Sequence, residues 1–317
     1  MAVWTAYSQV GIKEDVADVI SNISPTKTPF QAMIGSRSVD NKLFSWQEDS
    51  LRAAAQNHKV EGFTATENSP VATVLRTNYT QILSETIRVS GTSDAIAHYG
   101  RAKESAYQLA KSMAQCKRDL EYAYVGGAQS SAAGNSSTER DMAGFQAQLW
   151  NDADASGALQ LTTDAENAVK YTGSAATLPS EQNVLDVLTF LYNNGSEPDT
   201  IMVTPSNSLV VADFAKAAGR YRQVEDRKLM NVVDLYVSPF GQQRVVLNRF
   251  VHANNTLIFE KDMWQQAVLR SWFRETLAKT GDNVAMMIVG EYSLIHKNKA
   301  ASAAIVEDDG PTGFVAG

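Results

Sequence analysis

The residue types that most often carry enzyme chemistry are few and scattered in this sequence. The four histidines lie in unrelated segments, and the single cysteine cannot form a disulfide within the chain. The sequence contains no GxGxxG, GxxxxGK[ST], GxSxG or HExxH motif. We therefore predict no catalytic residues, no cofactor and no metal site. The histidines are His58, His98, His252 and His296, and the cysteine is Cys116.

The charged segments have simpler interpretations than a binding site. Asp152, Asp154 and Ser156 alternate as calcium ligands do, but the following residues do not match the spacing of an EF-hand loop, so we interpret this segment as a solvated acidic face. A basic cluster is interleaved with Glu225 and Asp226, which offset its positive field. We favour an ion-pair loop between subunits over a nucleic-acid contact there. The cluster consists of Arg220, Arg222, Arg227 and Lys228.

The composition indicates a globular protein. The chain has 317 residues, of which 44% are hydrophobic and 20% charged, enough for one large domain or two ordinary ones. The apolar runs are too short for a membrane span, and the N-terminus lacks the pattern of a signal peptide. The net charge of −7 argues against a nucleic-acid-binding surface over most of the chain. A single cysteine fits a reducing compartment.

The longest periodic stretch predicts a helix from Asp94 to Gly127. Apolar and small residues recur in alternating steps of four and three, so they share one face of a helix. Asp94 is the expected N-cap and Gly126 the stop, while Gly100 is a weak point at which the helix either starts late or bends. The face predicted to be buried consists of Ala102, Ala106, Leu109, Met113, Cys116, Leu120 and Ala123.

An arm and a two-stranded ribbon precede this helix. Residues 1–36 begin with a predicted short helix, Gly11–Ile20, after which two prolines favour an extended arm that lies on its own domain or on a neighbouring subunit. Residues 37–93 contain strand-forming runs around a polar connection, and neither face of the predicted strand Val71–Ser90 is uniformly apolar. Such a two-stranded ribbon is only marginally stable in isolation. We favour packing of the ribbon on a neighbouring subunit over the alternative that it folds back onto its own domain.

The remainder of the chain divides into three parts. Residues 128–179 are loop-rich and hold a flexible linker. Residues 180–270 alternate helices and strands. The first predicted helix has Ser180 as its N-cap, ends at Gly195 and carries one apolar face, which consists of Val184, Val187, Leu188 and Leu191. Residues 271–317 supply an arm, three strands that we expect to return to the long helix, and a loose tail. The predicted strands are Ala285–Val289, Tyr292–His296 and Ala301–Val306.

Four collinear stretches resemble the major capsid proteins of tailed bacteriophages, which have the HK97-like (Johnson) fold. The order of an N-terminal arm, an extended hairpin, a long helix, an α/β domain and returning strands is the layout of that family. The resemblance spans nearly the whole chain. It rests on the four stretches taken together, since none of them is a short diagnostic motif. The stretches are GIKEDVADVISNISPTKTPFQAMIG at Gly11–Gly35, NYTQILSETIRVSGT at Asn78–Thr92, AYQLAKSMAQCKRDLEYAYVGG at Ala106–Gly127, and LAKTGDNVAMMIVGEYSLIHKNKAASAAI at Leu277–Ile305.

The resemblance implies an α+β fold with five parts. These are the N-terminal arm at 1–36, the extended β-hairpin loop at 37–93, the spine helix and peripheral domain with a linker at 94–179, the α/β axial domain at 180–270, and the return strands of the peripheral sheet with the C-terminal tail at 271–317. The expected core of the spine helix consists of Ala106, Leu109, Met113, Cys116 and Leu120. The expected contacts between subunits are Phe30, Trp46, Arg52, Lys59, Arg220, Arg222 and Arg227.

The resemblance also implies a structural function. Hexamers and pentamers of the chain would assemble into an icosahedral head around double-stranded DNA, without sequence-specific binding, a cofactor or a membrane. Portal, scaffold and decoration proteins are further expected partners, and assembly would take place in the cytoplasm of the bacterial host. Because the arm-like sequence starts close to Met1, we expect no long cleaved segment before it. An encapsulin-like protein compartment is the alternative, and an unrecognised enzyme is the weaker one.

Overall fold

A computed structural model describes most of the chain. The described residues are 24–49, 51–52, 54–65, 70, 72–127, 129–149, 170–173, 180–217, 235–252 and 255–307. The predicted helix at 11–20, the acidic segment at 151–169, the C-terminal tail and the basic residues Arg220, Arg222 and Arg227 lie outside them. No helix among the described residues is long and apolar enough to cross a membrane.

The chain divides into two compact units. The first comprises Met1–Thr26, Ser84–Cys116 and Phe273–Val289. The second comprises Lys27–Leu83, Lys117–Trp272 and Gly290–Gly317. One helix and several strands run from one unit into the other, so the units are not separated by simple linkers.

A six-stranded sheet in the second unit has the order β5-β12-β9-β6-β8-β7. Its strands are β5 (Lys170–Gly173), β6 (Thr200–Val203), β7 (Leu235–Ser238), β8 (Gly241–Leu247), β9 (Thr256–Phe259) and β12 (Ser302–Glu307). The last strand, β12, pairs with β9 and β5, and its Ala304 belongs to the same hydrophobic cluster as Leu120 of the long helix.

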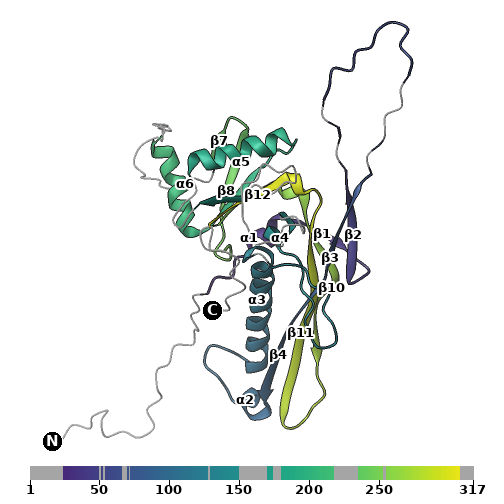
Figure 1. The fold of residues 1–317 in the computed structure, drawn as a ribbon. Coiled ribbons are helices and arrows are strands. Elements are labelled where there is room, and N and C mark those ends of the chain that lie inside the picture. The colour runs from purple at the N-terminus through teal and green to yellow at the C-terminus, as the bar shows by residue number, and fades with distance from the viewer. Residues whose placement is uncertain are drawn as a thin grey trace, which may run out of the picture. The chain divides into compact units, whose positions relative to one another are not determined.

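Two helices, α5 (Glu181–Asn193) and α6 (Pro205–Ala217), pack against this sheet (Figure 1). The predicted N-cap is present, since the Ser180 side chain accepts a hydrogen bond from the Asn183 N–H at 3.1 Å. All four apolar residues predicted for the inner face of α5 are buried and belong to one hydrophobic cluster with the sheet. They are Val184, Val187, Leu188 and Leu191.

The long helix is α3 (Glu104–Val125), which begins later than the predicted Asp94. Gly100 adopts a left-handed conformation with φ of 72°, and this breaks the predicted continuous helix. Asp94 lies in the short helix α2 (Gly91–Ala95), yet its Oδ1 accepts the Ser105 N–H at 3.0 Å. It therefore caps the first turn of α3 from outside the helix.

The predicted buried face of α3 is correct only toward the C-terminal end of the helix. Cys116 and Leu120 are 2% and 0% exposed. Leu109 and Met113 are half-buried, and Ala106 is exposed, contrary to prediction. The difference arises because the large side chains that bury the helix gather around its C-terminal turns.

Those large side chains form an aromatic cluster centred on Phe30 in the second unit. Phe30 belongs to α1 (Pro29–Met33) and is fully buried. Its ring makes edge contacts with four other rings at centroid distances from 5.6 to 6.0 Å. The prediction of Phe30 as a contact between subunits is therefore wrong, because it fills the core of its own chain. The four rings belong to Tyr124, Phe145 on α4 (Phe145–Leu149), Phe259 and Trp264.

A four-stranded sheet has the order β1-β10-β11-β4. Its strands are β1 (Gly35–Ser38), β4 (Gln81–Ser90), β10 (Trp264–Thr276) and β11 (Asn283–His296). The two strands predicted within 285–296 form the single strand β11. Short 3₁₀ turns, η2 (Lys261–Met263) and η3 (Lys299–Ala301), precede β10 and β12.

The predicted ribbon is a separate two-stranded hairpin. β2 (Leu43–Glu48) pairs antiparallel with β3 (Val74–Tyr79), from Leu43 opposite Tyr79 to Glu48 opposite Val74. The predicted strand Val71–Ser90 is interrupted at Thr80, so β3 and β4 belong to different sheets. Residues 49–73 form the connection beyond the open end of the hairpin, and we call them the extended loop (Figure 1).

Candidate functional site

The extended loop presents apolar side chains to solvent. All of its described residues, which are 49, 51–52, 54–65, 70 and 72–73, are exposed. Leu51 is 98% exposed, Val60 77% and Phe63 53%. Arg52 and Lys59 lie on the same segment. Exposed apolar side chains grouped on one segment are typical of a surface that binds another protein.

A buried ion cluster fixes the chain where β3 meets β4. Glu291 on β11 is 4% exposed, and its carboxylate accepts the Thr80 hydroxyl at 2.7 Å and Arg270 Nε at 2.9 Å. Arg140 donates both to Glu291 and to the Thr80 carbonyl. A buried carboxylate is stable only when its charge and lone pairs are satisfied, so these partners hold Thr80 in place.

Asn78 makes a second attachment at the same end of the hairpin. It is fully buried, and its Nδ2 donates to the Leu294 carbonyl at 2.8 Å. Its Oδ1 accepts the Ala143 N–H at 2.9 Å. The hairpin is thus joined to β11 and to the segment before α4 by a side chain that cannot be removed without leaving backbone groups unpaired.

The hairpin also has apolar and ionic contacts of its own. Trp46 stacks on Phe44 with a centroid distance of 5.9 Å and packs against a cluster that includes Ile295. Arg76 pairs with Glu48 at 3.0 Å. Trp46 is half-buried against its own chain, and the contact between subunits expected for its remaining surface stays a prediction.

A second buried carboxylate anchors the arm that follows Thr28. Glu121 on α3 is fully buried and accepts the N–H groups of Phe30 at 2.8 Å and Gln31 at 3.0 Å, together with Asn248 Nδ2 at 2.8 Å. Burial raises the pKa of Glu121, and these hydrogen bonds oppose the rise. The carboxylate lies at the N-terminus of α1, where it satisfies backbone donors that have no partner within the helix.

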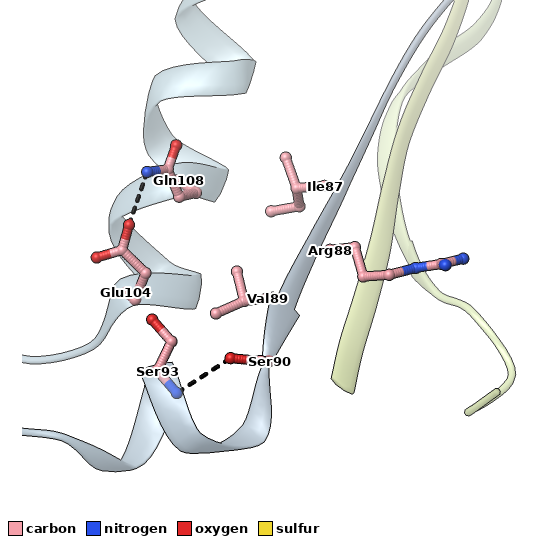
Figure 2. A pocket seen from close by; sticks show the side chains of 7 residues that line it. All are labelled: Ile87, Arg88, Val89, Ser90, Ser93, Glu104 and Gln108. Carbon is pink, nitrogen blue, oxygen red and sulfur yellow. Dashed lines mark hydrogen bonds between the residues drawn. The ribbon is translucent and has the colours of Figure 1, made fainter. Parts of the chain in front are cut away.

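The first unit contains a shallow hollow of about 330 Å³ between β4 and α3. Figure 2 shows Ile87 and Val89 pointing from β4 toward α3, whereas Arg88 points away. Gln108 donates to Glu104 at 2.7 Å on the helix side. These residues include no nucleophile beside a base, and no group of three or more His, Cys, Asp or Glu suited to a metal occurs in the described part of the chain.

His296 is the buried histidine of the second unit. Its ring stacks on Trp264 at 3.9 Å, and its Nε2 lies 3.0 Å from the Ser302 hydroxyl, while Nδ1 has no partner. Burial, with a smaller contribution from the charge of Arg76, lowers the pKa of His296 to about 3. The ring is therefore neutral at neutral pH and packs as an aromatic side chain.

We predict that His296 makes the subunit lose stability in acid. The unfolded chain binds a proton below pH 6.5, whereas the folded chain resists protonation until about pH 3, so stability falls as the pH decreases between these values. Denaturant titrations of wild type and His296→Gln measure the effect. The wild-type free energy of unfolding should decrease more steeply, by up to about 1.4 kcal/mol per pH unit. Parallel curves below pH 6.5 would contradict this, and the curves should run parallel above pH 7 as a control.

Sequence reasoning did not identify the buried carboxylates. Glu291 is the only acid in the run VAMMIVGEYSLIH, and Glu121 stands among Leu120 and the apolar residues that follow. A lone acid within an apolar run indicates a buried charge with specific partners. That signal was present at Glu291 but not at Glu121, which closely follows the charged residues Lys117, Arg118 and Asp119. The partners Arg140 and Asn248 are distant in sequence.

Comparisons with known proteins agree with this architecture. The model of the family described as SU10 major capsid protein matches residues 3–308. The major capsid protein of Escherichia phage Phieco32 is 32% identical and the match covers 95% of this chain and 96% of that protein. The capsid of cyanophage A-1(L) has a similar structure, with a TM-score of 0.70, 11% identity and coverage of 93% of this chain and 96% of that one. The capsid of cyanophage P-SCSP1u gives a TM-score of 0.61, with 12% identity and 96% of both chains covered.

Proposed function

Because the chain belongs to the SU10 major capsid protein family, we propose that its extended loop holds a neighbouring copy in the phage shell. The chain is a phage major capsid protein, a structural protein with the HK97-like α+β fold. The exposure of Leu51, Val60 and Phe63 carries the proposal, because burying such side chains against another subunit contributes about 25 cal/mol per Å² of apolar surface.

The contrast between the two ends of the hairpin supports the same role. Asn78 and Thr80 are fixed by buried hydrogen bonds, while the described loop residues cover no core of their own chain. A rigid attachment limits the conformations of the loop that must be ordered on binding, which lowers the entropic cost of assembly. Arg52 and Lys59 would add charged contacts at the rim of the interface.

The assembly that follows from this contact is a closed shell. Hexamers and pentamers of the chain would form an icosahedral head that encloses double-stranded DNA, without sequence-specific binding. Portal, scaffold and decoration proteins are proposed partners, assembly is proposed to take place in the host cytoplasm, and no catalysis is part of the proposal. An encapsulin-like compartment is not favoured, since the curated relative is a phage capsid protein.

Replacing Ser50–Ser69 by Asn-Gly tests the loop directly. The Asn-Gly turn shortens the connection while keeping β2 and β3 able to pair. We expect a folded subunit with near-wild-type thermal unfolding but no closed shells by electron microscopy. A Gly-Ser segment of the original length is the matched control, and it should also fail to assemble because the loop side chains are missing.

Three results would contradict the proposal in different ways. Closed particles of normal size from the Asn-Gly variant would mean that the loop does not hold the shell together. Loss of folding would mean that the loop belongs to the core of the subunit. Normal shells from the Gly-Ser control alone would assign the effect to loop length and not to its side chains.

A further inference from the structure

Residues 129–144, between α3 and α4, form a loop that is closed by its own backbone hydrogen bonds. The Gln129 carbonyl accepts the Gly144 N–H at 2.9 Å, which joins the two ends of the loop. Further along, Ala132 and Asp141 exchange two backbone hydrogen bonds at 2.9 and 3.2 Å. We call residues 129–144 the clamp loop.

Gly134 lets the two halves of the clamp loop approach each other closely. It adopts a left-handed conformation with φ of 61°. A Cβ atom at this position would lie 2.9 Å from the backbone nitrogen and Cα of Arg140, which is closer than such atoms approach. Only glycine therefore fits without displacing the backbone of Arg140.

The clamp loop contacts the junction of β3 and β4 at three points. Arg140 Nε donates to the Thr80 carbonyl, and Gln129 Nε2 donates to Gln81 Oε1 at 2.6 Å. The buried amide of Asn78 both donates to and accepts from the backbone of the same loop. Because β3 and β4 belong to different sheets, the backbone torsions at this junction set the direction in which the hairpin projects.

Arg140 differs from the other arginine that contacts Glu291. Arg270 donates to Glu291 as well, but in the described part of the chain Arg140 alone donates both to Glu291 and to the Thr80 carbonyl. A guanidinium presents its N–H donors in a rigid fork, so one side chain can hold two acceptors in a fixed geometry. The side chain thus links the buried carboxylate to the backbone of the junction.

We propose that Arg140 is a positioning residue, which holds the junction of β3 and β4 closed so that the hairpin projects in the direction needed for assembly. The clamp loop places Arg140, and Arg140 acts through the Thr80 carbonyl. The inference rests on the proposed function, because a fixed hairpin presents the extended loop to a neighbouring copy at a lower entropic cost.

Hydrogen exchange in unassembled full-length subunits tests the proposal. Arg140→Lys keeps the positive charge beside Glu291 but lacks the fork of donors. The amides of Tyr79 and Thr80 should exchange about ten- to a hundredfold faster than in wild type, since a hydrogen bond from a charged group no longer opposes local opening. The amides of α5 should exchange as in wild type, because the change is confined to the junction.

Two further variants separate the position of Arg140 from its charge. Gly134→Ala keeps Arg140 but forces its backbone to move, so it should also speed the exchange of Tyr79 and Thr80. Arg270→Gln is the matched control, since it removes a guanidinium from Glu291 and leaves the bond from Arg140 to Thr80 in place. Its exchange at the junction should stay close to wild type.

Three exchange results would overturn the proposal. The first is unchanged exchange of Tyr79 and Thr80 in both Arg140→Lys and Gly134→Ala. The second is an equal rise in α5, which would make Arg140 a general stabilising residue. The third is a rise of the same size in Arg270→Gln, which would assign the effect to the charge balance at Glu291.

Assembly distinguishes this proposal from the function on which it rests. Arg140→Lys should raise the protein concentration needed to form shells, as measured by light scattering. An unchanged threshold, with no shells from the variant that has Asn-Gly in place of Ser50–Ser69, would overturn the positioning role and keep the role of the extended loop. Closed shells from that Asn-Gly variant, which retains Arg140, would instead overturn the proposed function.

Discussion

Replacing Leu120 by Asp is expected to prevent the subunit from folding. Leu120 is 0% exposed and belongs to the apolar cluster around Phe30. An aspartate there would place a charge without a partner in the core, at a cost of about 4 kcal/mol or more. Domains are stable by only about 5–15 kcal/mol in total, so the variant should be insoluble or lack a cooperative unfolding transition. Circular dichroism and thermal unfolding of the purified protein measure this.

Leu109→Asp is the matched comparison on the same helix. The periodicity of the sequence predicts that Leu109 is buried, and on that basis its replacement by Asp would also prevent folding. The structure shows Leu109 half-buried, so an aspartate there can reach water and should cost only about 1–2 kcal/mol. A Leu120→Asp variant that unfolds like wild type, or a Leu109→Asp variant that fails to fold, would contradict the described burial of α3.

Local signals were sufficient where an element is specified by its own residues. The helix α5 has its N-cap at Ser180, four apolar residues on one face and Gly195 after its end, and the structure has the same helix with that face buried. The exposed loop was also predictable, because the connection between the strand-forming runs is largely polar. In both cases the nearby sequence contains the physical cause.

Tertiary contacts decided the elements that were predicted wrongly. Thr80 favours strand by its residue type, and the break between β3 and β4 comes from its contacts with Arg140 and Glu291. The late start of α3 depends on the left-handed Gly100 and on Asp94 capping from another helix. The burial of Phe30 depends on rings far along the chain, which a local pattern cannot reveal.

The same substitution at two phenylalanines should separate folding from assembly. Phe30→Ala removes a fully buried ring from the aromatic cluster, which should lower the free energy of unfolding by about 3–5 kcal/mol. Phe63→Ala removes a ring that is 53% exposed on the extended loop, and it should change subunit stability by less than about 0.5 kcal/mol. Denaturant titration of unassembled subunits measures both changes.

Assembly should respond in the opposite order once folding is accounted for. At a temperature where both subunits are folded, Phe63→Ala should raise the concentration needed to form shells, because the ring no longer contributes apolar area to a neighbouring copy. Phe30→Ala subunits that remain folded should assemble near the wild-type concentration, since Phe30 is covered by its own chain. Light scattering against protein concentration gives both thresholds. An unchanged threshold for Phe63→Ala would remove Phe63 from the proposed contact, and an unchanged unfolding curve for Phe30→Ala would contradict its place in the core.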